Sequence, residues 1–202
     1  MSISDRKQRE KTEMRNLILD AAMKLFLEVG YEHVTLRKIA EAIEYSPGTV
    51  YLYFKDKNEI FYALQTMAFH LFYQNQSAVM SAIANPKERL LKLGEAYLEF
   101  ALNNPEHYDL MFIMNAPMAC VSEDEDWVEG PKTFEFLVQV VSECMEAGEL
   151  PKGDPLVAAM AFWGEVHGLA ALSIRSRFFK LPKEQHLPML QKALSYMTKL
   201  TD

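Results

Sequence analysis

Apolar residues recur at helical spacing along the chain, and no stretch shows the two-residue alternation of a half-buried strand. One stripe runs through residues 17–29 and stops at Gly30, a typical residue just beyond a helix. A second stripe runs through residues 36–43, after Thr35, which can cap a helix N-terminus. The apolar positions are Leu17, Ile18, Ala21, Ala22, Leu25, Phe26, Val29, Leu36, Ile39, Ala40 and Ile43. This pattern predicts two helices.

A third, short helix is predicted to begin at Ser46-Pro47, because serine caps helices well and proline suits the first helical position. Val50 and Phe54 are four residues apart and can face inward. The remaining side chains carry hydroxyl groups or charges: Thr49, Tyr51, Tyr53, Lys55 and Lys57. Such side chains suit a helix pressed against nucleic acid. Together with the helix before it, this segment predicts a helix-turn-helix unit.

Proline placement predicts the starts of the later helices. Asn85-Pro86, Asn104-Pro105, Gly130-Pro131 and Asp154-Pro155 each place a capping-type residue before a proline. A long apolar segment fills residues 57–84. We therefore predict an all-α protein of about nine helices. A three-helix helix-turn-helix DNA-binding domain would occupy residues 1–56, and a helical effector-binding and dimerisation domain would occupy residues 57–202.

The last two predicted helices are apolar on two faces, and a helix of that kind needs two packing partners. One subunit would cover one face of each helix, and a second copy would cover the other. We therefore predict a homodimer with a four-helix interface. The predicted interface residues are Ala161, Gly164, Gly168, Ala171, Leu187, Leu190, Leu194 and Met197.

Composition restricts the compartment. Half of the 202 residues are hydrophobic, which is ample for a core. The N-terminal residues are polar, unlike a signal peptide, and we expect no apolar run to be long enough to span a membrane. Cys120 and Cys144 fit a reducing compartment better than a disulfide framework. We expect a cytoplasmic protein without a membrane partner.

The net charge of −7 argues at first against a nucleic-acid partner, but the charge is unevenly distributed. Residues 1–57 contain ten basic and nine acidic residues, whereas residues 58–202 contain eleven and nineteen. The cations near the N-terminus can present a local basic face to DNA, although ordinary solvated charges remain an alternative. These cations are Arg6, Lys7, Arg9, Lys11 and Arg15.

Residues 15–61 resemble the DNA-binding domain of the TetR (tetracycline-repressor-like) family of bacterial transcriptional regulators. The features that carry the resemblance are Ile18-Leu19-Asp20-Ala21-Ala22, Leu25-Phe26, Gly30-Tyr31, Val34-Thr35, Ile39-Ala40, Ser46-Pro47-Gly48-Thr49-Val50-Tyr51-Leu52-Tyr53-Phe54-Lys55-Asp56-Lys57 and Glu59-Ile60. One departure is Glu44-Tyr45, where relatives more often carry a glycine and a small apolar residue. The segment 163–169 also resembles a C-terminal signature of one TetR subgroup.

The resemblance implies a set of DNA-contacting residues. These are Thr35, Arg37, Lys38, Tyr45, Ser46, Pro47, Gly48, Thr49, Val50, Tyr51, Tyr53, Phe54 and Lys57. Gly48 would let the backbone approach DNA closely. Thr49 and Val50 would lie nearest the base edges. Tyr51, Tyr53 and Lys57 would bond phosphates, although a half-buried core position is the alternative for the tyrosines.

The resemblance also implies a pocket for a largely apolar small-molecule effector among the middle helices. Its candidate residues are Phe69, Phe72, Tyr108, Met111, Phe112, Trp163 and His167. For any one of them, ordinary core packing remains the alternative. The chain shows no catalytic constellation, no metal-ligand spacing of its histidines and no cofactor fingerprint, so we expect no enzyme activity, metal or cofactor.

The sequence therefore predicts a homodimeric transcriptional regulator. By family analogy it is a repressor that a small-molecule effector releases from a pseudo-palindromic operator in double-stranded DNA. The alternative is an all-α small-molecule binding protein whose DNA-binding domain is vestigial.

Overall fold

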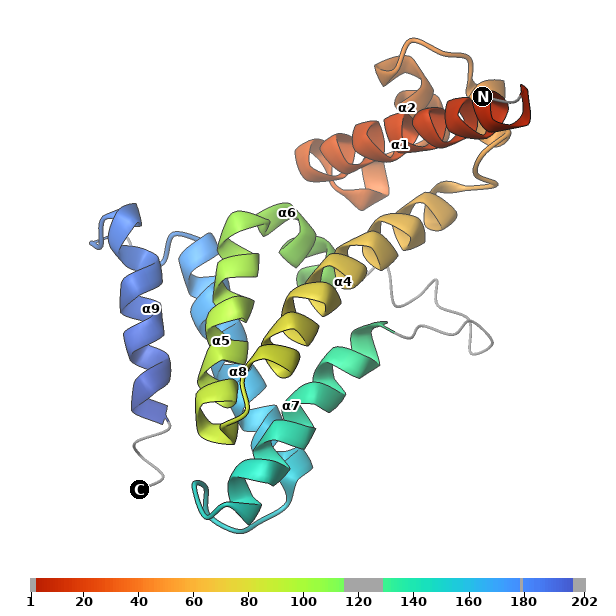
Figure 1. Ribbon diagram of the computed structural model, residues 1–202. Helices are drawn as coiled ribbons and strands as arrows, with labels where there is room; N and C mark the ends of the chain where they lie inside the picture. The colour runs from red at the N-terminus through yellow and green to blue at the C-terminus, as the bar shows by residue number, and fades with distance from the viewer. Residues whose placement is uncertain (1–2, 115–128, 179, 198–202) are drawn as a thin grey trace. The chain divides into compact units, whose positions relative to one another are not determined.

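The computed structural model describes residues 3–114, 129–178 and 180–197, and over these ranges every regular element is helical (Figure 1). The elements are α1 (Ile3–Val29), the 3₁₀ turn η1 (Tyr31–His33), α2 (Leu36–Ala42), α3 (Pro47–Tyr51), α4 (Lys57–Ala82), α5 (Pro86–Asn103), α6 (Pro105–Tyr108), the π-helical segment η2 (Asp109–Ile113), α7 (Glu129–Glu146), α8 (Pro155–Ile174) and α9 (Lys183–Met197). The all-α prediction and its count of about nine helices are confirmed for the described residues.

The described residues form two compact units. Unit 1 holds residues 3–67 and 109–114, and unit 2 holds residues 68–108, 129–178 and 180–197. The division falls inside α4, so this helix contributes its first turns to one unit and its last turns to the other. The predicted domain boundary between residues 56 and 57 stays a prediction.

Unit 1 is built around the C-terminal half of α1. Ile18, Leu19, Ala22 and Phe26 are buried on one face of the helix, and the helix ends before Gly30, whose φ of 78° suits glycine. Phe26 packs with the rings of Tyr31 and Phe61, at centroid distances of 5.7 and 4.9 Å. These contacts fix α1 against the start of α4.

Two side-chain caps position the helices of the helix-turn-helix. Thr35 Oγ1 accepts a hydrogen bond of 3.2 Å from the Lys38 amide at the start of α2. Ser46 Oγ accepts one of 3.2 Å from the Thr49 amide at the start of α3, and Pro47 is the first helical residue. The predicted cap at each of these helix starts is therefore confirmed.

The turn between α2 and α3 has a strained residue. Glu44 adopts a φ of 60°, a left-handed conformation that costs a residue with a Cβ atom roughly 1–2 kcal/mol. This residue belongs to Glu44-Tyr45, the pair at which the sequence departs from the pattern that it resembles. The turn geometry is kept without glycine, at a conformational cost.

Unit 2 has its core among α5, α7 and α8. The core residues are Leu90, Leu93, Val140, Val141, Cys144, Leu150 and Ala159. Helix α9 packs against α5 at a glycine: a Cβ atom added to Gly94 would lie 3.0 Å from Leu194 Cδ1. Helix α9 can approach α5 this closely because the glycine has no side chain.

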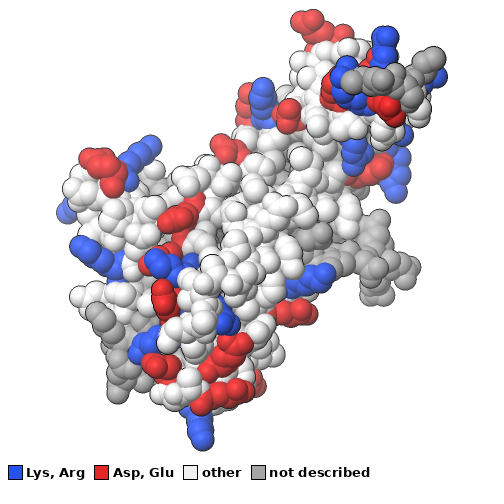
Figure 2. Space-filling model, viewed as in Figure 1, with Lys and Arg blue, Asp and Glu red and all other residues white. Residues whose placement is uncertain are grey.

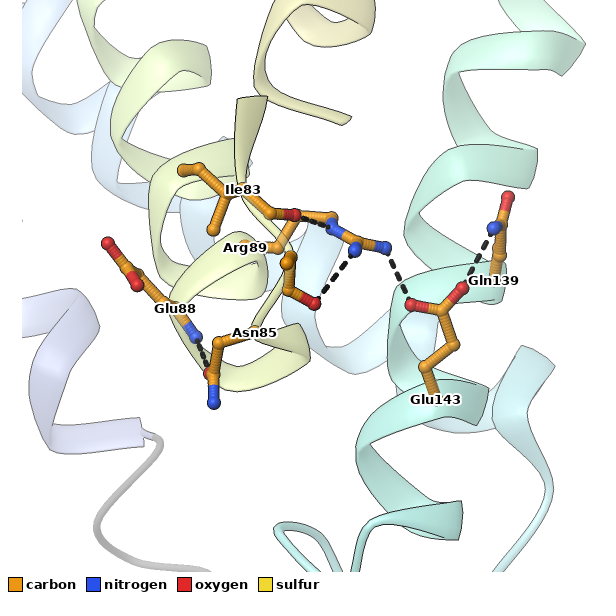
Figure 3. Close-up of polar contacts among 7 residues, drawn as sticks. Ile83, Asn85, Glu88, Arg89, Gln139 and Glu143 are labelled. Atoms are coloured by element: carbon orange, nitrogen blue, oxygen red, sulfur yellow. Dashed lines mark hydrogen bonds and ion pairs between the residues drawn. The ribbon is translucent and has the colours of Figure 1, made fainter. Parts of the chain in front are cut away.

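Arg89 joins the segment between α4 and α5 to α7 (Figure 3). Its guanidinium donates to the carbonyl oxygens of Ile83 at 2.6 Å and Ala84 at 3.0 Å, and to Glu143 Oε2 at 2.6 Å. Gln139 then donates to the other carboxylate oxygen of Glu143, at 2.8 Å. All three donor nitrogens of the guanidinium are thus occupied, and the arginine side chain is only 13% exposed.

Candidate nucleic-acid interface and effector site

The exposed surface around α3 comprises the two residues before the helix and three of its five residues. Tyr45, Ser46, Pro47, Gly48 and Tyr51 are exposed, and we call these five residues the recognition surface. Tyr45 is 46% exposed and Tyr51 is 60% exposed, which is unusual for residues so large. A Cβ atom at Gly48 would meet only Ser46 Oγ, at 3.6 Å, so the backbone here is open to close approach. DNA phosphates accept hydrogen bonds from hydroxyl groups, from closely approached backbone N–H groups and from helix N-termini.

The structure corrects the prediction of DNA contact for two residues, Val50 and Phe54. Val50 is completely buried and Phe54 is 1% exposed, so both belong to the core of unit 1 and cannot reach a base edge. Their four-residue spacing places them on the inner face of the segment. Thr49 is half-buried, and its hydroxyl lies 3.0 Å from that of Ser46.

Leu52 was not predicted and is 80% exposed, next to Tyr51. Sequence reasoning missed it because a leucine inside a helix-turn-helix pattern ordinarily indicates core. In the structure α3 ends at Tyr51, so Leu52 lies just beyond the helix and its side chain is exposed.

Each of the three basic residues predicted to contact DNA already has a partner within the protein. Arg37 is exposed and pairs with Glu41 at 3.0 Å, while Lys38 Nζ donates to the His33 carbonyl oxygen at 2.8 Å. Lys57 Nζ donates to the Tyr31 carbonyl oxygen at 3.1 Å and lies 4.2 Å from the centroid of the Tyr31 ring. All three cations are therefore held by the protein, and their roles toward phosphate stay predictions, like that of half-buried Tyr53.

Unit 2 contains a second candidate site, built from residues far apart in the sequence. The hydroxyl oxygens of Tyr97 in α5 and Tyr108 in α6 each lie 3.0 Å from His167 Nδ1 in α8. The Tyr108 hydroxyl also donates to the His167 carbonyl oxygen, at 3.1 Å. We call these three residues the tyrosine–histidine cluster.

Aromatic side chains surround this cluster. The Phe72 ring of α4 contacts those of Tyr97 and Phe100, at centroid distances of 5.3 and 5.1 Å. On the other side, Trp163 lies 6.0 Å from the His167 ring and 5.6 Å from the Phe134 ring. The structure thus brings together four of the predicted effector residues: Phe72, Tyr108, Trp163 and His167.

The other predicted effector residues are less closely connected. Phe69 is buried in unit 2, whereas Met111 and Phe112 belong to unit 1, so a shared site for all three stays a prediction. Sequence reasoning did not include Tyr97, Phe100 and Phe134 in the site. Tyr97 and Phe100 are two of several apolar positions in α5, and periodicity alone does not indicate which of them meets His167.

Burial changes the protonation behaviour of this region. It raises the pKa of Tyr97 well above its ordinary value and lowers the pKa of His167, because each charged form would lose its hydration. Burial also raises the pKa of Glu165. Burial therefore favours a neutral Tyr97 and a neutral His167 imidazole.

Gln76 follows Phe72 by one helical turn on α4 and is 5% exposed. Its amide Nε2 is buried and makes no hydrogen bond with any residue in the described ranges. An unsatisfied buried donor costs about 1–3 kcal/mol, so it is a strong candidate for a ligand or water contact.

Helices α8 and α9 each leave an apolar face uncovered in the single chain. On α8 the exposed face comprises Val157, Met160, Ala161, Gly164 and Leu172, with half-buried Gly168 and Ala171 beside it. On α9 the large exposed apolar residues are Met189 and Tyr196, at 45% and 66% exposure. Met189 and Tyr196 are seven residues apart, close to two helical turns, so both lie on one side of α9.

Part of the predicted dimer interface on α9 is wrong. Leu190 is 3% exposed and Leu194 is 8% exposed, because both are covered within the chain. Leu194 lies against Gly94, and Leu187 is half-buried. The opposite face of α9 is the uncovered one. Met197 is the last residue of the helix, and its side chain lies outside the described part of the structure.

Helix α8 corrects one further expectation. Pro155–Ile174 has the length and the apolar composition of a membrane-spanning helix, with a mean hydropathy of 1.4 over its most apolar window. Length and composition are weak support for a membrane span, since the core helix of a globular protein passes the same test. An uncovered apolar face is equally what a subunit interface requires.

Comparison with known families places both halves of the chain. Residues 18–64 match the model for bacterial regulatory proteins of the tetR family, and residues 90–195 match the tetracyclin repressor-like C-terminal domain. The HTH-type transcriptional repressor AcnR of Corynebacterium glutamicum is 31% identical over 156 residues, which is 75% of this chain and 76% of AcnR. The regulator HbdR of Aromatoleum sp. (strain CIB) is 34% identical over 85 residues, but the match spans only 42% of this chain and 37% of HbdR.

Solved structures show the same fold. A TetR/AcrR regulator from Thermobifida fusca superposes with a TM-score of 0.66 at 23% identity, covering 90% of this chain and 96% of that one. The TetR regulator PfmR from Thermus thermophilus gives a TM-score of 0.71 at 21% identity, covering 90% and 97%. With the helix-turn-helix in unit 1 and the helical body in unit 2, the chain belongs to the TetR family of bacterial transcriptional regulators.

Proposed function

We propose that this regulator is a cytoplasmic homodimer that represses transcription from a pseudo-palindromic operator until an effector binds in unit 2. The observation that carries the proposal is the recognition surface, which presents Tyr45 before α3, and Gly48 and Tyr51 within it, to solvent. Two such surfaces in a dimer would enter successive major grooves about 34–36 Å apart.

The proposed dimer is formed through the exposed faces of α8 and α9. The exposed surface includes the large side chains of Met160 on α8 and Tyr196 on α9, and the small residues Ala161 and Gly164 on α8, which allow two helices to approach closely. A Cβ atom at Gly164 would meet nothing within 4 Å in the single chain, so there is room for a partner helix there. A second copy would remove this apolar surface from water.

We further propose that the effector is uncharged. Among the described residues no lysine or arginine is buried, and the half-buried cations of unit 2, Lys87 and Arg89, are paired with Glu149 and Glu143. A buried carboxylate would therefore have no compensating charge, which is a large cost. The interior offers aromatic surface and hydrogen-bonding groups instead.

The hydrogen-bonding groups specify the effector further. The amide of Gln76 is a buried donor that lacks an acceptor, and the tyrosine–histidine cluster supplies hydroxyl groups and an imidazole. A largely apolar molecule with a carbonyl, ether or hydroxyl oxygen would satisfy Gln76 and pack on Phe72 and Trp163. An aromatic or medium-chain ketone represents this class.

Operator binding can be tested with duplexes from the protein's own promoter region, by fluorescence anisotropy at several salt concentrations. Tyr51→Phe removes one exposed hydroxyl and is expected to weaken binding by about tenfold or more, since hydrogen bonds to charged groups contribute about 1.5–3 kcal/mol. Tyr73→Phe, in the unit 2 part of α4 and outside the recognition surface and the proposed dimer faces, is the matched control. Binding without sequence preference would contradict the proposal and favour a vestigial DNA-binding domain.

The effector class can be tested by comparing acetophenone, ethylbenzene and benzoate, three probes of similar shape. We expect acetophenone to raise the melting temperature most and to bind at least about tenfold more tightly than benzoate. Gln76→Leu should abolish the preference for acetophenone over ethylbenzene. Tighter binding of benzoate would contradict the uncharged class, whereas operator binding is measured without these compounds and would stand.

A further inference from the structure

The N-terminal part of α1 extends beyond the core of unit 1. The helix begins at Ile3, yet its buried residues start only at Ile18, so residues 4–13 form about three helical turns that are exposed throughout. Basic and acidic side chains both gather at this end of the helix (Figure 2). Ordering an exposed helical extension costs conformational entropy. Ion pairs within the helix or contacts with a partner can offset that cost.

The ion pairs of this extension lie on one side of the helix. Arg6 Nε pairs with Glu10 at 2.7 Å, and Arg9 Nε pairs with Glu13 at 3.4 Å, each across one helical turn. These two arginines are thereby satisfied within the helix, and the charges of the two glutamates are balanced.

The remaining cations of α1 lie on a different side. Lys7, Lys11 and Arg15 follow one another at four-residue intervals, and we call them the cationic stripe. Lys7 and Lys11 are exposed, and neither forms an ion pair among the described residues. Three like charges on one helix face repel one another weakly, and a bound anion would remove this repulsion.

The stripe continues the face of α1 that packs into unit 1. One step of three residues from Arg15 reaches Ile18, and steps of four then reach Ala22 and Phe26, all of which are buried on the same side of the helix. The guanidinium of Arg15 also lies 4.3 Å from the centroid of the Phe54 ring, close after the end of α3. The stripe therefore leads away from the helix-turn-helix on the same side of α1 as α3.

We infer that the cationic stripe is a second DNA-contacting surface, which binds backbone phosphates beside the groove that the recognition surface enters. From Arg15 to Lys7 it extends the contact by about 12 Å along α1, at 1.5 Å per residue. Lys7 and Lys11 bind phosphate as point charges, and Arg15 is held by Phe54 as the fixed end of the stripe. Such contacts add affinity and position the protein, without reading sequence.

The test compares two double variants that remove the same charge from the same helix. Lys7→Ala with Lys11→Ala should lower the slope of log K against log salt by about 2 for each protomer, or about 4 for a dimer, equally on operator and non-operator DNA. Arg6→Ala with Arg9→Ala should leave the slope within about 0.5 of the unaltered protein. Lys7→Arg with Lys11→Arg should keep it.

Equal slopes for the two alanine variants would overturn the inference, because only net charge would then matter. The inference rests on operator binding, which the unaltered protein reports in the same titration, so the two can fail separately. Helix content, measured by circular dichroism, should match between the alanine variants. A hydroxyl-radical footprint that shrinks at both ends with the lysine variant alone would add independent support.

Discussion

Helix α3 and the tyrosine–histidine cluster differ in how their polar groups are supplied. At α3, the cap on Ser46 and the open backbone at Gly48 come from three consecutive residues, and the apolar anchors Val50 and Phe54 face the opposite way. In unit 2, Tyr97, Tyr108 and His167 are brought together from three helices, and α4 adds Phe72. A local segment can specify a surface, whereas an interior site depends on the tertiary packing that surrounds it.

This contrast predicts that unit 2 is the more sensitive to a single change. Arg89→Ala would leave Glu143 without its ion-pair partner and would leave the carbonyl oxygens of Ile83 and Ala84, just after α4, without their donor. We expect the free energy of unfolding to fall by about 3 kcal/mol, as for other broken ion pairs of low exposure. Urea denaturation measures it. Lys92→Ala, which removes an exposed pair with Glu95, is the control and should cost less than about 0.5 kcal/mol.

A second comparison separates folding from association within α9. Leu194→Ala would open a cavity against Gly94 and should cost about 2–3 kcal/mol of stability. Met189→Asp lies on the uncovered face, so it should weaken dimerisation and leave the monomer folded. Sedimentation velocity and thermal unfolding distinguish the two. If Leu194→Ala dissociated the dimer without destabilising the subunit, the corrected interface would be wrong.

A substitution in the turn before α3 is expected to stabilise the protein, unlike the substitutions above. Glu44→Gly should raise the free energy of unfolding by up to about 1 kcal/mol, because glycine accepts the left-handed φ and the gain exceeds the extra entropy of the unfolded chain. Glu41→Gly, inside α2, is the control and should destabilise by about 1 kcal/mol. Thermal unfolding of both variants gives the sign directly.

The smallest expected effect concerns His167. Its pKa is lowered in the folded protein, so the unfolded chain binds more protons and stability is lost as the pH falls through about 6.5. Above that pH the imidazole is neutral in both the folded and the unfolded chain, so its protonation takes no stability away. Comparing the pH dependence of stability between the unaltered protein and His167→Gln, from pH 8 to pH 5.5, should show a shallower slope in the variant.

The sequence predicted the local features of the fold well. Caps at Thr35 and Ser46 and the stop at Gly30 depend on residues within one helical turn, so they could be identified directly. Val50 and Phe54 were assigned to DNA because a family motif names positions and does not separate its inner face from its outer one. Their spacing already favoured the interior.

The apolar helices of unit 2 were harder to interpret. Both faces of α9 are apolar, and spacing alone cannot decide which one packs within the chain. The absence of a side chain at Gly94 decides it, because it admits Leu194. The same limit applies to Tyr97, whose role depends on where α8 brings His167. Tertiary contacts, which a single sequence does not reveal, determine both.

Cys144 gives unit 2 a natural reporter of its own opening. The thiol is completely buried in the α5–α7–α8 core, and burial raises its pKa to about 11, so it is protonated and shielded at neutral pH. A thiol reagent can reach it only when the core opens, and the labelling rate then measures the population of open molecules. In a Cys120→Ser background, a compound that binds this unit would slow the labelling. Effector screening could therefore be done without DNA, dyes or heating.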